Sequence, residues 1–193
     1  MKWTYTALLI AGLVSCKEDD NHRALPLVND GEVHALRNGE DASSGFTVRL
    51  AATTGSPLRC FPGNLTLLAM YSVREDILRQ SYAIENIPLQ LGTHPIQRVE
   101  IGRQTCGSDT ISAYFGTSVS DGDVNGDIYL PVADENNIVS ITSLDETTGK
   151  VEGTFQMTLA IELNDYPPYK SDANAPDTIR LTQGWFSATV REN

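Results

Sequence analysis

The stretch Val151–Leu163, VEGTFQMTLAIEL, decides the fold class. Its odd-numbered positions hold Val, Gly, Phe, Met, Leu, Ile and Leu, whereas its even-numbered positions hold Glu, Thr, Gln, Thr, Ala and Glu. An apolar residue at every second position indicates a β-strand, because successive side chains of a strand point to opposite faces. A helix would repeat its apolar residues at i, i+3 and i+4. The stretch therefore predicts a long strand with one face in a core and the other in water.

The same alternation extends outward on both sides, at Phe46–Ala52 and Leu65–Val73. The last segment, 178–191, changes phase between Leu181 and Phe186, which predicts a β-bulge at Gln183–Gly184. Turn residues separate these segments, and no connection is long enough for a crossover helix, so we expect antiparallel pairing. The fold predicted for residues 32–193 is all-β, a single antiparallel β-sandwich. Further strands are expected at 32–37, 80–91, 94–101, 110–116, 127–132 and 137–144.

Length and charge limit the remaining possibilities. The chain has 193 residues, enough for one domain, and its 14 Lys and Arg against 25 Asp and Glu give a net charge of −11. A nucleic-acid partner is not expected, because binding phosphates requires an excess of basic side chains. Residues 16–31 are polar and without periodicity, which indicates a flexible tether ahead of the domain.

The N-terminus carries a sorting signal over residues 1–15. A basic start at Lys2 precedes an apolar run over 7–14, which is shorter than the ~20 residues of a transmembrane helix. Leu13–Cys16 then resembles a bacterial lipobox, which implies that Cys16 is lipidated and becomes the new N-terminus. Several acyl chains on one cysteine would hold the protein on a membrane. The alternative is an ordinary secretory signal with Cys16 as a plain thiol.

The acidic run after Cys16, Lys17–Asp20, resembles the surface-export signal of Bacteroidota lipoproteins. It implies an outer-membrane protein at the cell surface. The alternatives are an outer-membrane protein that faces the periplasm, and an acidic run that serves only as a tether.

Three further runs resemble one family of small Bacteroidota lipoproteins: Asn137–Asp145, with its ITSLD; Gly149–Thr158, with its VEGTF; and Ile179–Phe186. Leu91-Gly92-Thr93 also fits the family pattern. The resemblance covers 1–20 and about 80–191, and 32–75 match less well. The family is a domain of unknown function expected to be a β-sandwich, so the resemblance implies a location and a fold, and no catalytic residues.

Two cysteines remain besides Cys16, and an even pair in an exported chain predicts a disulfide between Cys60 and Cys106. The alternative is two buried free thiols. The histidines His22, His34 and His94 are isolated and have no metal-ligand spacing, so we interpret them as surface or turn residues.

An Asp-rich run at 121–127 has the pattern of the first half of a calcium loop. Oxygen side chains alternate at Asp121, Asp123, Asn125 and Asp127, with a glycine at the sixth position. The second half fails, because Val132 occupies the position where a calcium loop has its bidentate glutamate. The competing interpretation is an ordinary turn, since Asp, Gly and Asn are common turn residues.

Two weaker candidate sites remain. Tyr166, Tyr169 and Trp185 offer flat rings that suit a carbohydrate platform, or else form a packing clasp over an edge of the domain. Thr110 and Thr178 each lie in an Asp-Thr-Ile triplet that resembles the O-glycosylation site of exported Bacteroidota proteins.

Together these features predict a lipid-anchored cell-envelope protein with a non-enzymatic binding or structural role. The membrane is its expected partner through the lipid anchor, with a glycan or an envelope protein as a further partner. No cofactor is expected, and calcium is the one metal considered. The alternative is a glycan-binding accessory lipoprotein of a nutrient-uptake system. A hydrolase is a third class. Carboxylates are plentiful in the chain, and a catalytic pair like that of a glycosidase is defined by the distance between two carboxylates in space, which the sequence does not give.

Overall fold

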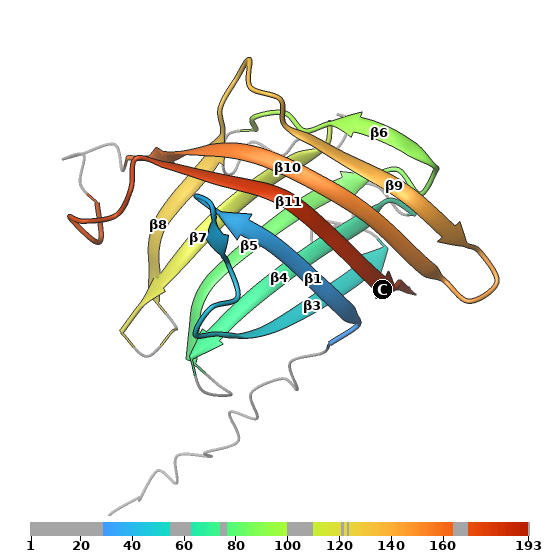
Figure 1. Ribbon diagram of the computed structural model, residues 1–193, viewed down its shortest axis with the longest axis horizontal. Helices are drawn as coiled ribbons and strands as arrows, with labels where there is room; N and C mark the ends of the chain where they lie inside the picture. The colour runs from blue at the N-terminus through green and yellow to red at the C-terminus, as the bar shows by residue number, and fades with distance from the viewer. Residues whose placement is uncertain are drawn as a thin grey trace, which may run out of the picture.

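The computed structural model describes residues 29–54, 63–73, 77–99, 110–120, 122, 124–163 and 170–192, and these ranges contain strands and turns but no helix. Figure 1 shows the strands wrapped around a common interior. The strands are β1 (Gly31–Arg37), β2 (Glu40–Asp41), β3 (Thr47–Thr54), β4 (Leu65–Val73), β5 (Ile77–Ile87), β6 (Gly92–Pro95), β7 (Ser112–Val119), β8 (Val124–Pro131), β9 (Ile138–Asp145), β10 (Lys150–Glu162), β11 (Thr178–Thr189) and β12 (Arg191–Glu192).

The prediction of an all-β, antiparallel domain is confirmed, but the predicted sandwich is wrong. Eight strands follow one another in the order β1-β3-β4-β5-β7-β8-β10-β11, and β11 pairs with both β10 and β1. The sheet therefore closes on itself as a barrel. Alternation along a strand reports that one face is buried, and this holds equally for two stacked sheets and for one closed sheet. The ring closes where β11 pairs with β1 as well as with β10. Periodicity does not show which strands pair, so it does not predict this closure.

The bulge predicted in the last strand is confirmed. Along β11, the pairing with β1 shifts at Gln183–Gly184 and the pairing with β10 shifts at Thr182–Gln183. Gln183 has φ of +51°. A Cβ on Gly184 would lie 2.6 Å from the ring of Phe155, so only glycine fits against that ring. The bulge keeps Leu181 and Phe186 in the same core although they differ in phase.

One edge of β10 is shared by two strands. β8 pairs with its C-terminal half and β9 with its N-terminal half, in the same direction. Asn137, which is 5% exposed, fills the gap between them: its amide donates to the carbonyl of Val132 at 2.8 Å, and its Oδ1 accepts from the backbone N–H of Thr158 at 2.7 Å. β6 then extends the wall outside β9. β8 and β9 thus act as one interrupted strand.

The two ends of the barrel differ, and we name them here. The packed end is filled by aliphatic side chains, namely Leu65, Ile87, Ile96, Ile111 and Val151, all at most 5% exposed. The middle holds an aromatic row in which Tyr82 lies between Tyr71 and Phe155, at ring distances of 6.0 and 5.4 Å. Beyond this row, where β1 ends and β11 begins, lies the cavity end.

The first described residues contribute to the packed end. The carboxylate of Asp30 accepts from the backbone N–H of Ala52 at 2.8 Å and pairs with Arg191 at 2.7 Å. The Asn29 side chain accepts from the backbone N–H of Leu50. These contacts join β1, β3 and β12 where the chain enters the barrel.

Candidate functional site

A cavity of about 620 Å³ occupies the cavity end of the barrel. Its apolar walls come from Phe46, Val73, Phe115 and Ile179. Its polar groups come mainly from β1, β5, β7, β8 and the segment before β11: Arg37, Asn38, Glu40, Arg79, Gln80, Thr117, Ser118, Asp127, Tyr129, Ser171 and Asp172. The interior of an eight-stranded barrel is just wide enough for side chains to fill it or to leave a small cavity, and here side chains fill one end and a cavity lies at the other.

Arg37 and Gln80 meet across the lumen. The Arg37 guanidinium donates to the side-chain oxygen of Gln80, although β3 and β4 separate β1 from β5 in the wall. Both side chains are half-buried. The link crosses the barrel next to the aromatic row, so it separates the packed interior from the cavity.

A bulge in β5 adds a second guanidinium to the cavity. Tyr71 pairs with Gln80 and Ser72 pairs with Leu78, which leaves Arg79 as the extra residue. Arg79 lines the cavity beside Gln80, and its guanidinium donates to the carbonyl of Ser120 at 2.8 Å. Bulges re-aim side chains and are common at the rims of barrels.

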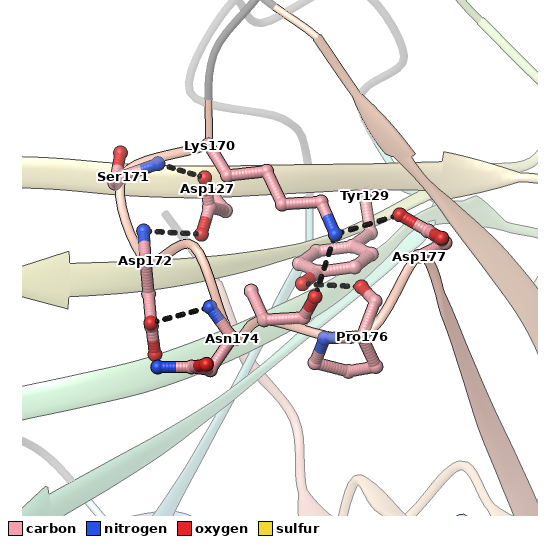
Figure 2. A network of polar contacts seen from close by, with 9 residues as sticks. Asp127, Tyr129, Lys170, Ser171, Asp172, Asn174, Pro176 and Asp177 are labelled. Atoms are coloured by element: carbon pink, nitrogen blue, oxygen red, sulfur yellow. Dashed lines mark hydrogen bonds and ion pairs between the residues drawn. The ribbon is translucent and has the colours of Figure 1, made fainter.

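A second bulge, in β8, turns Asp127 into the interior. Gly126 and Asp127 lie opposite the single residue Thr117, whose hydroxyl accepts from the backbone N–H of Asp127 at 2.7 Å. The carboxylate of Asp127 is buried, with 5% of the residue exposed. It accepts from the backbone N–H of Ser171 at 2.6 Å and of Asp172 at 3.3 Å. Figure 2 shows both contacts.

These contacts anchor the segment 170–177, which we call the strap. Within it, Lys170 donates to the carbonyl of Ala175 and pairs with Asp177, both at 2.7 Å. Tyr129 donates its hydroxyl to the carbonyl of Pro176 at 3.0 Å. The strap is thus held to β8 at two points, and Figure 2 shows Tyr129 beside the Lys170–Asp177 pair.

The surroundings of Tyr129 favour its neutral form. Burial raises the pKa of its phenol, the charges of Asp127, Asp172 and Asp177 add to the rise, and Arg37 partly offsets it, giving a pKa of about 12. Tyr129 is therefore a hydrogen-bond donor at neutral pH. Its hydroxyl holds the strap through the carbonyl of Pro176. Because the phenol stays protonated, Tyr129 is a poor base.

Of the residues predicted to bind calcium, the structure describes Asn125 and Asp127. Both oxygens of the Asp127 carboxylate already accept backbone N–H groups, and Asn125 lies on β8 opposite Ser118. Asp121 and Asp123 lie outside the described residues. Among the described residues, no group of three or more His, Cys, Asp or Glu side chains is arranged to hold a metal ion.

Trp185 lies on the outer face of the barrel, away from the cavity. It pairs with His34 on one side and Thr154 on the other, and it is 41% exposed. A surface groove of about 360 Å³ runs beside it, lined by Ile138, Thr154, Phe155, Gln156, Gln183 and Gly184. Tyr166 and Tyr169, the other members of the predicted platform, lie outside the described residues.

The remaining predicted sites are spread over the molecule. Cys16, Cys60, Cys106 and His22 lie outside the described residues. Thr178 is half-buried at the start of β11, and the carbonyl of Thr110 accepts from the side chain of Asn86 at 3.0 Å. His34 lies 3.7 Å from the carboxylate of Asp41, and His94 lies 3.4 Å from the carbonyl of Gln90. No two described sites share a cavity.

Sequence reasoning missed most of the polar lining of the cavity, above all Arg37, Arg79, Gln80 and Tyr129. Arg37 and Gln80 occupy inward positions of alternating strands, where a polar residue breaks the pattern. That break was the available signal. It was hidden because the strands expected from the sequence end at 37 and begin at 80, and polar residues are also expected where a strand meets a turn.

Comparison of the chain with family models, curated proteins and solved structures gives no match. The described part of the chain contains no helix long and apolar enough to cross a membrane.

Proposed function

We propose that this protein is a lipid-anchored, non-enzymatic binding module of the bacterial cell envelope that takes a small molecule into the cavity end of its barrel. One observation carries the binding role: the cavity of about 620 Å³. It combines apolar walls with a few polar groups on well-anchored strands, as small-molecule sites do.

The location rests on the N-terminal sequence. A basic start, an apolar run and the lipobox-like Leu13–Cys16 support lipidation of Cys16, and the acidic Lys17–Asp20 supports export to the cell surface. Replacing Cys16 with serine is expected to abolish palmitate incorporation and to move the protein from the membrane fraction to the soluble fraction. Unchanged membrane association of the Cys16→Ser protein would contradict the anchor. Complete protection of the wild-type protein from protease on intact cells would contradict surface exposure.

The non-enzymatic role is supported by how the cavity's ionisable groups are used. Asp127 accepts two backbone N–H groups, and Tyr129 donates to the carbonyl of Pro176. Both side chains hold the strap in place. A general base must reach the proton that it removes, and here both groups are directed at the backbone of the strap.

The binding role is tested by filling the cavity. Ala175 lines the cavity and is half-buried, whereas Ala173 in the same strap is exposed and does not line it. A panel with one apolar body and three head groups (naphthylacetate, naphthylacetamide and naphthylethylamine) is added to the full chain. We expect at least one compound to raise the melting temperature of wild type and Ala173→Trp but not of Ala175→Trp. If no compound does so, or if Ala175→Trp responds like wild type, the proposal is wrong.

A second candidate function, glycan binding on the outer face, is favoured by the exposed Trp185 beside its groove. Thr154, Gln156 and Gln183 place neutral hydrogen-bonding side chains around the ring, and an exposed indole can stack on a sugar. A glycan panel tested with and without calcium, on wild type and Trp185→Ala, decides between the sites. Binding that Trp185→Ala removes and Ala175→Trp preserves would favour the outer groove.

A further inference from the structure

The cavity holds two guanidinium groups that no carboxylate of the described chain neutralises. Arg37 donates to the neutral amide of Gln80, and Arg79 donates to the backbone carbonyl of Ser120. Four other described basic side chains pair with acids: Arg98 with Glu162, Lys150 with Glu152, Lys170 with Asp177 and Arg191 with Asp30. A half-buried cation is costly unless a negative charge lies near it, and the described residues supply none to these two groups, although the chain has a net charge of −11.

The carboxylates of the same cavity are placed differently. Both oxygens of Asp127 accept backbone N–H groups of the strap, and Asp172 accepts the N–H of Asn174 at 2.9 Å. Glu40 is exposed at the rim. The acids therefore already have hydrogen-bond donors or face water, whereas each guanidinium keeps N–H donors that no described residue accepts.

The position of Arg37 suits recognition of a ligand. It lies at the floor of the cavity, and its charge acts on the phenols of both Tyr71 and Tyr129, whose pKa values are raised chiefly by burial. Phe46, Val73, Phe115 and Ile179 surround the space above it. A planar guanidinium with free N–H groups matches the geometry of a carboxylate and binds it through paired hydrogen bonds.

Building on the proposed binding function, we infer that the ligand is an amphipathic organic acid. Its carboxylate would bind the Arg37 guanidinium, with Arg79 as a second positive charge, and its apolar body would lie against the phenylalanine and aliphatic walls. Arg37 is thus the residue that determines specificity for an anionic head group.

The test compares naphthylacetate with naphthylacetamide, which differ in charge and share the same ring, by calorimetry on the full chain. We expect wild type to bind the acid at least about tenfold more tightly than the amide. Arg37→Gln is expected to reduce this preference to about twofold or less without weakening the amide. Arg180→Gln removes the same charge from the exposed outer face of β11 and is expected to keep the preference.

The outcomes of these experiments distinguish the proposed binding function from the inferred specificity for an acid. Equal affinity of wild type for acid and amide, with both lost in Ala175→Trp, would overturn the anionic specificity and leave the binding function standing. A preference for the acid that persists in Arg37→Gln would overturn the role of Arg37. Lack of binding by every naphthyl compound would overturn both claims. If Arg37→Gln does not fold, the wild-type preference and an Arg37→Lys variant, expected to retain part of it, still decide the inference.

Discussion

The two ends of this barrel are built from the same strands but have different contents. At the packed end, Leu65 and Ile87 are fully buried in an aliphatic core. At the cavity end, Arg37, Gln80 and Asp127 occupy inward positions on three different strands, β1, β5 and β8. The packed end therefore supplies folding free energy through burial, whereas the cavity end keeps space and polar groups that burial alone does not explain. The difference teaches that side chains fill the barrel at one end and leave a cavity at the other, where we propose that a ligand binds.

Matched truncations give the largest expected effect. Ile87→Ala at the packed end is expected to lower the free energy of unfolding by about 4 kcal/mol, and Ile179→Ala beside the cavity by about 2 kcal/mol. Both isoleucines are buried, at 0% and 3% exposed, but Ile179 borders space that is already empty and loses fewer contacts. Urea unfolding measures both values. Equal losses, or a larger loss for Ile179→Ala, would contradict the contrast between the ends.

The buried carboxylate of Asp127 gives the next largest effect. Asp127→Asn is expected to lower the free energy of unfolding by about 1.5–3 kcal/mol, because the acceptor loses its charge and one backbone N–H of the strap then faces the amide NH2 group, which cannot accept it. Hydrogen exchange should accelerate at the amides of Ser171 and Asp172, which donate to Asp127. Asp134→Asn, on the exposed connection between β8 and β9, is the control and should leave these amides unchanged. Unchanged exchange in Asp127→Asn would mean that other contacts hold the strap.

Alkaline unfolding tests the environment of Tyr129. The folded state raises the pKa of its phenol to about 12, so between its ordinary value of 10 and about 12 the folded protein keeps a proton that the unfolded chain releases. Stability from this group is complete below pH 10 and falls as the pH rises through that window. Tyr129→Phe should show a shallower alkaline loss than wild type.

Tyr129→Phe is also expected to lower the stability of the protein at neutral pH. Loss of the hydrogen bond to the carbonyl of Pro176 should lower stability by about 1 kcal/mol. Identical slopes of stability against pH in wild type and Tyr129→Phe would contradict the assigned environment. Tyr71, Tyr82 and Tyr114 also have raised pKa values through burial, so the difference between the two proteins is the quantity to measure.

The smallest effect is expected at the outer face. Trp185 is 41% exposed, so Trp185→Ala should change the free energy of unfolding by no more than about 1 kcal/mol. Binding of naphthylacetate in the cavity should be unaffected. Loss of that binding in Trp185→Ala would mean that the outer groove, and not the cavity end, is the site.

Periodicity correctly predicted an all-β, antiparallel domain, but it did not predict that the sheet closes into a barrel. The inward face of β10, from Val151 to Leu159, is buried at every odd position as expected, although Leu163 lies beyond the strand and is 45% exposed. The phase change in β11 correctly located a bulge, because a bulge shifts the alternation by one residue. Whether two sheets stack or one sheet closes depends on the partner of the last strand, which alternation does not encode.

The candidate site was harder to predict for a similar reason. Arg79 and Asp127 face the cavity because bulges in β5 and β8 turn them inward, and neither bulge has a clear phase change in the sequence. Arg37 and Gln80 are 43 positions apart and meet only across the closed barrel. Asp127 was predicted as a calcium ligand or a turn residue, and in the structure its carboxylate accepts backbone N–H groups of the strap.

The central claim, that the cavity end is the binding end, is tested most directly by hydrogen–deuterium exchange with and without saturating naphthylacetate. The account predicts slower exchange in the strap, at Ser171 and Asp172, and along Thr117–Val119, with no change at the packed end around Ile87 and Val151. Protection confined to the packed end or to the strands around Trp185, or no protection anywhere, would contradict it.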